Sequence, residues 1–215
     1  MALVVWSGGA DSTLVLYDLL KDQRALDSDT KQEIRTISIS QEQVIGGKES
    51  RKARDRIEKW LNKKDLYFER TEITIQQESK RGCLFSPAGL IQPVMWLAIA
   101  CQYTLADEDL YFGYIREDDL WHYKGEFVYA HDNLKAIQRK TGVIRCPLEW
   151  ENKYSVLCRL NKIGLLDLIW YCEDPQKGKP CSKCDPCNKH NGALSKLKAI
   201  EKAYKKVIEK ENQNK

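Results

Sequence analysis

The sequence predicts an α/β protein with a parallel sheet. Runs rich in β-branched residues alternate with helical patterns along the chain, and this order is typical of parallel strands covered by helices. The chain has 215 residues, of which 42% are hydrophobic and 31% charged, as expected for one soluble domain with a small appendage. Because cysteines concentrate after Trp150, we divide the chain into an α/β domain over residues 1–150 and a C-terminal segment over 151–215.

Four short runs are the expected strands: Leu3–Trp6, Ile34–Ile39, Phe68–Ile75 and Leu110–Tyr114. Three helical patterns, each with an apolar face that can cover a sheet, cover Thr13–Leu20, Glu49–Leu61 and Gly89–Leu105. A last amphipathic helix is predicted from the three-to-four spacing of Leu194, Leu197, Ile200, Tyr204, Val207 and Ile208.

Composition narrows the classes of partner. The most apolar region, Ala88–Leu105, is interrupted by polar residues and Pro93, so we expect no membrane span. The first residues lack the pattern of a signal peptide, and we therefore expect a cytoplasmic protein. The net charge of +4 is small and comes largely from the lysine-rich end, so it supports a nucleic-acid partner only weakly.

A glycine-rich turn, Ser7-Gly8-Gly9, separates the first expected strand from the first expected helix. Glycines lack the Cβ atom that bars close approach, their N–H groups can converge on an anion, and the helix dipole adds favourable potential. The sequence therefore predicts a phosphate-binding loop, although the lysine of G-x-x-x-x-G-K-[ST] and the third glycine of G-x-G-x-x-G are both missing. The alternative is a plain glycine turn in which Asp11 only caps the helix.

Four cysteines near the C-terminal end have the spacing C-x8-C-x2-C-x2-C: Cys172, Cys181, Cys184 and Cys187. Four thiolates within so short a stretch suit tetrahedral zinc. An iron–sulfur cluster would use the same ligands and stays open, whereas disulfides are disfavoured in a cytoplasmic chain. We expect a closed structural zinc site that pins the last helix to the core. The remaining cysteines are expected to be buried apolar fillers: Cys83, Cys101, Cys146 and Cys158.

The stretch S-G-G-x-D-S over residues 7–12 resembles the pyrophosphate-binding loop of the N-type ATP pyrophosphatases, which cleave ATP between the α- and β-phosphates to adenylate a substrate. Together, the loop and the cysteine spacing resemble one branch of that family, the 7-cyano-7-deazaguanine synthases. The resemblance implies a Rossmann-like domain of the adenine nucleotide alpha hydrolase type. It also implies that pyrophosphate is held by Ser7, Gly8, Gly9, Asp11 and Ser12, with Asp11 holding the loop or Mg²⁺.

The stretch CPLEWENKYSVL, residues 146–157, is similar to a proline-leucine strand end that a lysine follows in the family. On that likeness Lys153 would lie near the ATP phosphates and act in catalysis with Asp11 and Ser12. The alternative is a surface lysine on a helix.

Members of that branch convert 7-carboxy-7-deazaguanine to an acyl adenylate, let ammonia displace AMP, and use a second ATP to dehydrate the amide to the nitrile. The resemblance thus implies ATP, Mg²⁺ and Zn²⁺ as cofactors, a deazaguanine carboxylate and ammonia as substrates, and a homodimer.

One stretch departs from the family. After the strand that ends near Gly113, the usual Tyr-Pro-Asp-Cys-Arg is replaced by DLWHYKGEF, Asp119–Phe127, where Trp121 and His122 could bind a flat base or only pack. Such drift is expected of a paralogue carried by phages or by antiphage defence systems, whose acceptor is a protein or a nucleic acid. Two further alternatives are a tRNA-base sulfurtransferase, which needs an activated cysteine, and a nucleotide-binding module without catalysis.

Overall fold

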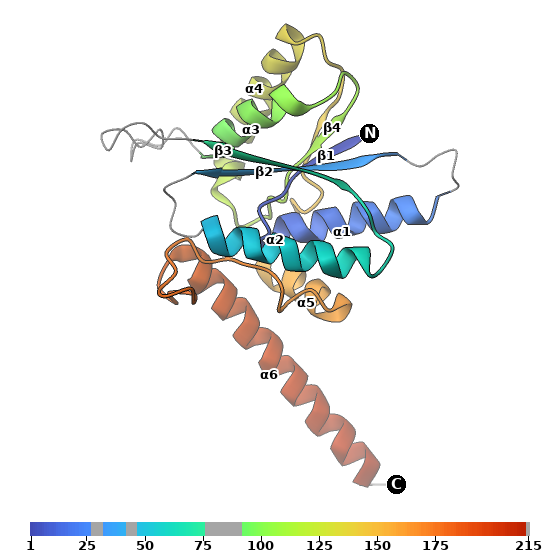
Figure 1. The fold of residues 1–215 in the computed structure, drawn as a ribbon. Coiled ribbons are helices and arrows are strands. Elements are labelled where there is room, and N and C mark those ends of the chain that lie inside the picture. Colours follow the sequence, from blue (N-terminus) through green and yellow to red (C-terminus); the bar gives the residue numbers. More distant parts are fainter. Residues whose placement is uncertain (27–31, 42–46, 76–91, 214–215) are drawn as a thin grey trace.

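The computed structural model describes residues 1–26, 32–41, 47–75 and 92–213. Over these residues, five parallel strands form an open sheet with helices on both faces (Figure 1), in the order β3-β2-β1-β4-β5. The strands are β1 (Ala2–Val5), β2 (Ile34–Gln41), β3 (Glu69–Ile75), β4 (Asp109–Tyr111) and β5 (Ile144–Arg145). The prediction of an α/β fold with a parallel sheet is confirmed.

The helices divide between the two faces of the sheet (Figure 1). One face carries α1 (Ala10–Arg24), α2 (Gly47–Asn62) and α5 (Lys153–Ile163). The other carries α3 (Gln92–Tyr103) and α4 (Lys124–Ile137), which follows a short 3₁₀-helix, η2 (Asp119–Tyr123). The last helix, α6 (Asp185–Gln213), starts beside α5 and then projects away from the rest of the chain (Figure 1).

All four expected strands are present, with ends shifted by up to three residues. The fourth ends at Tyr111 and not at Tyr114, because the chain turns toward α1 after it. The structure adds β5, α4 and α5 to the predicted elements. Residues 89–91 of the third expected helix lie outside the described residues, as does Cys83.

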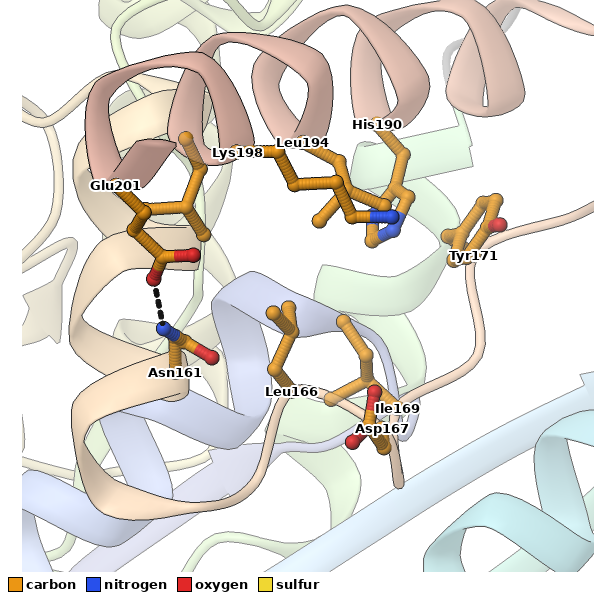
Figure 2. A pocket seen from close by; sticks show the side chains of 10 residues that line it. Asn161, Leu166, Asp167, Ile169, Tyr171, His190, Leu194, Lys198 and Glu201 are labelled. Atoms are coloured by element: carbon orange, nitrogen blue, oxygen red, sulfur yellow. Dashed lines mark hydrogen bonds between the residues drawn. The ribbon is translucent and has the colours of Figure 1, made fainter. Parts of the chain in front are cut away.

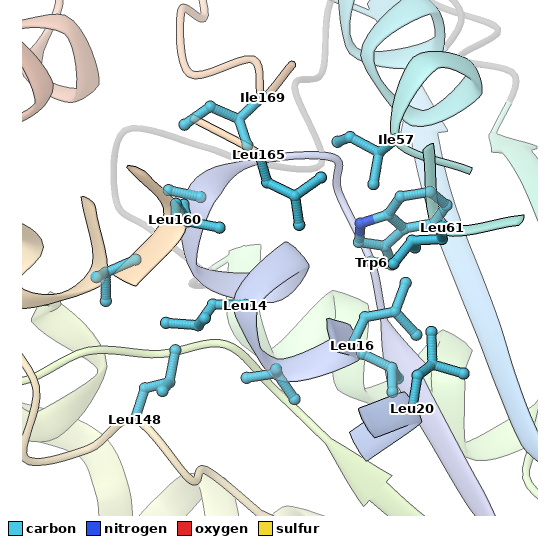
Figure 3. Close-up of a cluster of buried hydrophobic side chains, with 14 of the residues drawn as sticks. Trp6, Leu14, Leu16, Leu20, Ile57, Leu61, Leu148, Leu160, Leu165 and Ile169 are labelled. Atoms are coloured by element: carbon cyan, nitrogen blue, oxygen red, sulfur yellow. The ribbon is translucent and has the colours of Figure 1, made fainter. Parts of the chain in front are cut away.

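The core has two parts because successive side chains of β1 point to opposite faces of the sheet. Val4, and Trp6 just after the strand, pack against leucines and isoleucines of α1, α2 and α5, as Figure 3 shows around Trp6. Leu3 instead joins a second buried cluster with Leu97 of α3 and Phe127 of α4. The central strand is thus buried on both faces, which explains why its sequence is continuously apolar.

The residues after position 150 share this core. Val156, Leu157 and Leu160 of α5, followed by Leu165 and Ile169, belong to the same buried cluster as Trp6. A boundary near residue 150 stays a prediction. Among the described residues, no helix combines the length and apolarity needed to cross a bilayer.

Candidate functional site

The glycine loop joins the carboxyl end of β1 to α1. Gly8 has a φ of +81°, and a Cβ atom there would lie 2.8 Å from Cγ of Arg54 and 3.2 Å from the carbonyl oxygen of Ser50. Glycine is therefore the residue that fits this position. Gly9 is the N-cap of α1 and has no side chain to accept a hydrogen bond, so no N-cap side chain satisfies the first N–H groups of the helix. Asp11 lies inside the helix, and the alternative that it caps α1 is wrong.

Two serine hydroxyls close the loop on itself. The Oγ atom of Ser12 lies 3.0 Å from Oγ of Ser7 and accepts a hydrogen bond from the Ser7 N–H at 3.2 Å. The Oγ atom of Ser7 in turn accepts from the N–H of Gly9 at 3.2 Å. These bonds hold the three residues 7–9 in a tight turn at the N-terminus of α1, where the helix dipole favours an anion.

The loop after β4 comes against this turn. A Cβ atom on Gly113 would lie 2.4 Å from the backbone nitrogen of Ser12, so the Gly113 backbone packs directly on the first turn of α1. β1 and β4 are neighbours, and the chain changes direction across the sheet between them. Open α/β sheets bind ligands at such switch points, beyond the carboxyl ends of the strands.

Lys153 reaches the loop from α5. Its Nζ atom lies 2.6 Å from Oδ2 of Asp11, and both side chains are largely buried. Lys153 is the first residue of α5, whose N-cap Asn152 accepts a hydrogen bond from the N–H of Ser155 at 2.9 Å. Lys153 is thus an ion-paired residue of the site and not a free surface lysine.

The other oxygen of the Asp11 carboxylate, Oδ1, is buried and has no hydrogen-bond partner among the described residues. A buried carboxylate oxygen without a partner costs free energy unless a ligand satisfies it. Carboxylate oxygens are the ligands that Mg²⁺ prefers in proteins, so this atom fits a magnesium ion bound with a phosphate.

A second carboxyl group, that of Asp118, interacts electrostatically with Asp11 and Lys153. Asp118 follows β4, and its Oδ2 atom accepts a hydrogen bond from the N–H of Ile115 at 2.8 Å. Burial, with a smaller contribution from the negative charge of Asp11, raises the pKa of Asp118 to about 6, although the Ile115 N–H and the positive charges of Lys153 and Lys189 oppose the rise. Sequence analysis does not single out Asp118, because one acidic residue after a strand has no distinctive spacing.

Arg54 of α2 contacts the glycine loop through a hydrogen bond to its backbone. It is almost completely buried, donates from Nη1 to the carbonyl oxygen of Ser7 at 3.1 Å, and pairs with Glu72 of β3. Burial lowers the pKa of Arg54, and Glu72 opposes that shift. Sequence analysis does not identify this residue either. Its signal is an arginine within the apolar stripe of α2, three residues before Ile57 and seven before Leu61.

The four predicted metal ligands come together. The sulfur atoms of Cys172, Cys181, Cys184 and Cys187 all lie within 4.8 Å of one another. Those of Cys181 and Cys187 are 3.9 Å apart, close to the ~3.8 Å separation that a tetrahedral zinc–thiolate site has. Backbone N–H groups of Lys183 and Cys184 at the Cys181 sulfur lower the pKa of that thiol to about 6, which favours the thiolate that binds metal. The cluster could therefore hold a metal ion, and its donor set fits zinc.

Two of the cysteines outside the cluster have poorly acidic thiols. Burial raises the pKa of Cys101 to about 11 and that of Cys146 to about 12. Cys101 is buried, as expected, whereas Cys146 and Cys158 are only half-buried. Cys101 and Cys146 therefore lack the lowered pKa that an activated sulfur carrier needs.

Trp121 and His122 lie in η2, close to Asp118 in the chain. The Trp121 indole N–H donates to the carbonyl oxygen of Ile115, and Nζ of Lys124 lies 5.3 Å from the centroid of the ring. Trp121 is thus half-buried and anchored, whereas His122 is exposed. The structure brings both residues to the loop region after β4, and their role toward a substrate stays a prediction.

A hollow of about 360 Å³ lies between the end of α5, the segment that follows it and α6 (Figure 2). The Tyr171 and His190 rings on its border are stacked with their centroids 3.6 Å apart. His190 is buried, and its Nδ1 atom has no partner among the described residues. Burial, with a contribution from Lys153, lowers the pKa of His190 to about 4, so the ring is neutral at physiological pH. None of the loop residues 7–12 lines this hollow.

Comparison with known proteins adds no family assignment: no protein-family model matches the chain, and no curated protein matches it.

Proposed function

We propose that this chain is an ATP-dependent ligase of the N-type ATP pyrophosphatase kind, with a Rossmann-like nucleotide domain. One observation carries the proposal: Lys153 pairs with Asp11 at 2.6 Å, beside a closed Ser-Gly-Gly turn at the N-terminus of α1. Backbone N–H groups, a lysine and a carboxylate then converge on one place at the switch point of the sheet. This is the set of groups that binding and orienting a triphosphate requires.

Each group has a defined task in this proposal. Gly8, Gly9 and the first turn of α1 bind the β- and γ-phosphates, which leave together as pyrophosphate. Lys153 stabilises the negative charge that grows on the leaving oxygens, and Asp11 keeps the lysine oriented. Ser7 and Ser12 hold the shape of the turn. Mg²⁺, which Asp11 Oδ1 is placed to ligate, would neutralise charge on the phosphates when bound.

We further propose that zinc binds Cys172, Cys181, Cys184 and Cys187, with all four positions filled by protein. Such a closed site has no open coordination position for water or substrate, so the ion stabilises structure.

The proposed acceptor is a deazaguanine-type carboxylate, which is adenylated and then attacked by ammonia. Adenylation turns a carboxylate oxygen into a good leaving group, and the site needs no nucleophilic side chain for this because it acts by positioning and electrostatics. The departure at DLWHYKGEF, which forms η2 and the start of α4, favours a second candidate. In that candidate, the same adenylation modifies a protein or nucleic acid within a defence system.

Pyrophosphate release from ATP tests the proposal. We expect release with 7-carboxy-7-deazaguanine and ammonia, with AMP formed in equal amount, and none from the Asp11→Ala variant. Release that needs a macromolecular acceptor would favour the second candidate. If purified wild-type protein released no pyrophosphate with any of these acceptors yet still bound ATP, a nucleotide-binding module would replace the ligase.

A further inference from the structure

One short segment, residues 170–172, connects the glycine loop to the cysteine cluster. At one end, the Trp170 N–H donates to the carbonyl oxygen of Gly8 at 3.0 Å. The carbonyl oxygen of Trp170 lies 3.4 Å from the place where a Cβ atom of Gly9 would be. The backbone of Trp170 therefore packs on both glycines of the loop.

The contact to Gly8 controls an N–H group of the loop. A trans peptide unit is planar, so the carbonyl oxygen of Gly8 and the N–H of Gly9 point in opposite directions. When Trp170 holds that oxygen, it helps to fix the direction of the Gly9 N–H, which donates to Oγ of Ser7 in the structure. Gly8 has a positive φ and no side chain, and its backbone would otherwise have more freedom than that of any other residue.

At the other end, the segment is part of the cysteine cluster. The Trp170 indole N–H donates to the carbonyl oxygen of Cys172 at 2.7 Å, and the Cys172 sulfur accepts from the N–H of Cys181 at 3.2 Å. Tyr171, between them, stacks on His190, one turn after Cys187 in α6. The segment that reaches Gly8 thus ends at one cysteine of the cluster, Cys172, and contacts α6 one turn after another, Cys187.

Packing alone fixes the segment incompletely. Ile169 packs in the buried cluster, but the side chain of Tyr171 borders the hollow between α5 and α6 (Figure 2). The position of residues 170–172 then depends on the contact of Trp170 with Gly8 at one end and on the contacts of Cys172 within the cysteine cluster at the other. Without a metal, four thiols or thiolates have no common ligand to hold them within 4.8 Å, and that end of the segment loosens.

We infer that Trp170 is a positioning residue through which a metal ion on the cysteine cluster sets the anion affinity of the glycine loop. The inference rests on the proposed function, which gives the loop an anion and the cluster a metal. Coupling of this kind is reciprocal, so pyrophosphate on the loop must tighten metal binding by the same factor.

The test measures both halves of this linkage with inorganic pyrophosphate and Zn²⁺ as probes. We expect zinc removal to weaken pyrophosphate binding by about tenfold, and pyrophosphate to tighten zinc binding by the same factor, within the range common for coupled sites. The Trp170→Phe variant loses the indole N–H that bonds Cys172, so the coupling factor should fall toward one while one zinc still binds. Trp150→Phe is the matched control, because Trp150 is 82% exposed.

Hydrogen exchange gives a second readout that does not need the zinc-free form to stay folded. In zinc-loaded protein, the amides of residues 8–13 should exchange faster in Trp170→Phe than in wild type, with no change in Trp150→Phe. Equal pyrophosphate affinity with and without zinc, or unchanged coupling and exchange in Trp170→Phe, would overturn the inference. If zinc-loaded wild type bound no pyrophosphate at all, the proposed function itself would fail, and the two failures are thereby distinguished.

Discussion

The ammonium group of Lys153 lies 2.6 Å from the carboxylate of Asp11, although 142 positions separate the two residues in the chain. The pair joins the first turn of α1 to the first turn of α5, at the end of the sheet where β1 and β4 stop. A phosphate group entering the loop would compete with Asp11 for the lysine. The pair thus keeps the lysine side chain beside the loop until an anion arrives.

Removing either charge of this pair should abolish most of the activity. We expect Asp11→Asn and Lys153→Met each to lower ATP-dependent pyrophosphate release by about 10²–10³-fold, as loss of one charge-stabilising group typically does. Because the residues act together, the double variant should lose little more than either single one. Steady-state pyrophosphate assays on folded variants measure this.

The matched control is a second ion pair between the same helices. Nη2 of Arg159 in α5 lies 2.6 Å from Oδ2 of Asp18 in α1, away from the loop. Arg159→Met should leave pyrophosphate release within a few-fold of wild type. A similar loss of activity in Arg159→Met would show that the α1–α5 connection matters and not the charges at the loop.

A methyl group at Gly113 should damage the loop. The Cβ atom of Gly113→Ala would lie 2.4 Å from the Ser12 nitrogen, so the first turn of α1 or the loop after β4 must move. We expect weaker pyrophosphate binding and a lower melting temperature, measured by calorimetry on the same samples.

Two other glycines separate these effects. A Cβ atom on Gly125 meets nothing within 4 Å, so Gly125→Ala should change neither property for the worse. A Cβ atom on Gly142 would lie 1.9 Å from the carbonyl oxygen of Glu108, at the opposite end of the sheet. Gly142→Ala should lower the melting temperature and leave pyrophosphate affinity unchanged. Equal loss of affinity in Gly113→Ala and Gly142→Ala would mean that instability alone explains it.

The purified protein should contain one zinc ion per chain. Cys184→Ser removes one thiolate of the cluster and should lower both the zinc content and the melting temperature, because metal binding is coupled to folding of the ligand segment. Cys158→Ser, outside the cluster, should keep the zinc. Elemental analysis distinguishes the outcomes, and iron in place of zinc would contradict the assignment.

Asp118 should make the protein less stable above pH 6 than below it. Its pKa is raised to about 6 in the folded chain, while an exposed aspartate titrates near 3.8. Between these values the folded state binds more protons than the unfolded state, so the free energy of unfolding falls as pH rises from about 4 to 6. Asp118→Asn cannot ionise and still offers an oxygen to the Ile115 N–H. It should raise the free energy of unfolding at pH 7 by at most about 3 kcal/mol.

Urea unfolding of wild type and Asp118→Asn at pH 4 and pH 7 tests this prediction. The stability difference should be large at pH 7 and nearly absent at pH 4. A difference that stays constant with pH would show that burial of the Asp118 charge is not its cause. Because Asp118 lies beside Asp11 and Lys153, we also expect the stabilised variant to be less active.

His122 should contribute to acceptor use. It is exposed in η2, so His122→Ala can be made without loss of packing. With 7-carboxy-7-deazaguanine as acceptor, we expect a higher Michaelis constant for the acceptor and an unchanged affinity for ATP. Trp121→Phe keeps an aromatic ring but loses the hydrogen bond to Ile115, and serves as comparison. Parental kinetics in both variants would show that neither side chain contributes to acceptor use.

Local patterns predicted most of the fold. Strands β1 to β3 carry β-branched runs and β4 starts an apolar and aromatic run, whereas β5 has two residues and no periodicity. Helix α5 has signals that sequence analysis overlooked: Asn152 caps its start, and Gly164 ends it with a φ of +84°. Helix α4 begins within DLWHYKGEF. We interpreted this stretch as part of an acceptor pocket because it differs from the family that the chain resembles.

Sequence analysis predicted those parts of the candidate site whose residues lie close together in the sequence and form a recognisable motif. The glycine turn and the cysteine cluster are of this kind, and the structure brings the four cysteines together. The contacts of Arg54, Gly113 and Trp170 with the loop come from residues far along the chain. Such tertiary contacts leave no periodic trace in one sequence. Lys153 was placed only through the resemblance to a family.

The order of strands in the sheet has a consequence for synthesis. Of the five strands described, β1 leaves the ribosome first, yet it occupies the middle of the sheet, and both of its neighbours emerge later. The glycine turn is translated about a hundred residues before Gly113 and still longer before Lys153 and Trp170, the residues that contact it in the folded chain. A nascent or prematurely terminated chain therefore carries the glycine turn without the contacts that shape it. On the proposed function, we expect such a chain not to bind ATP before folding is complete.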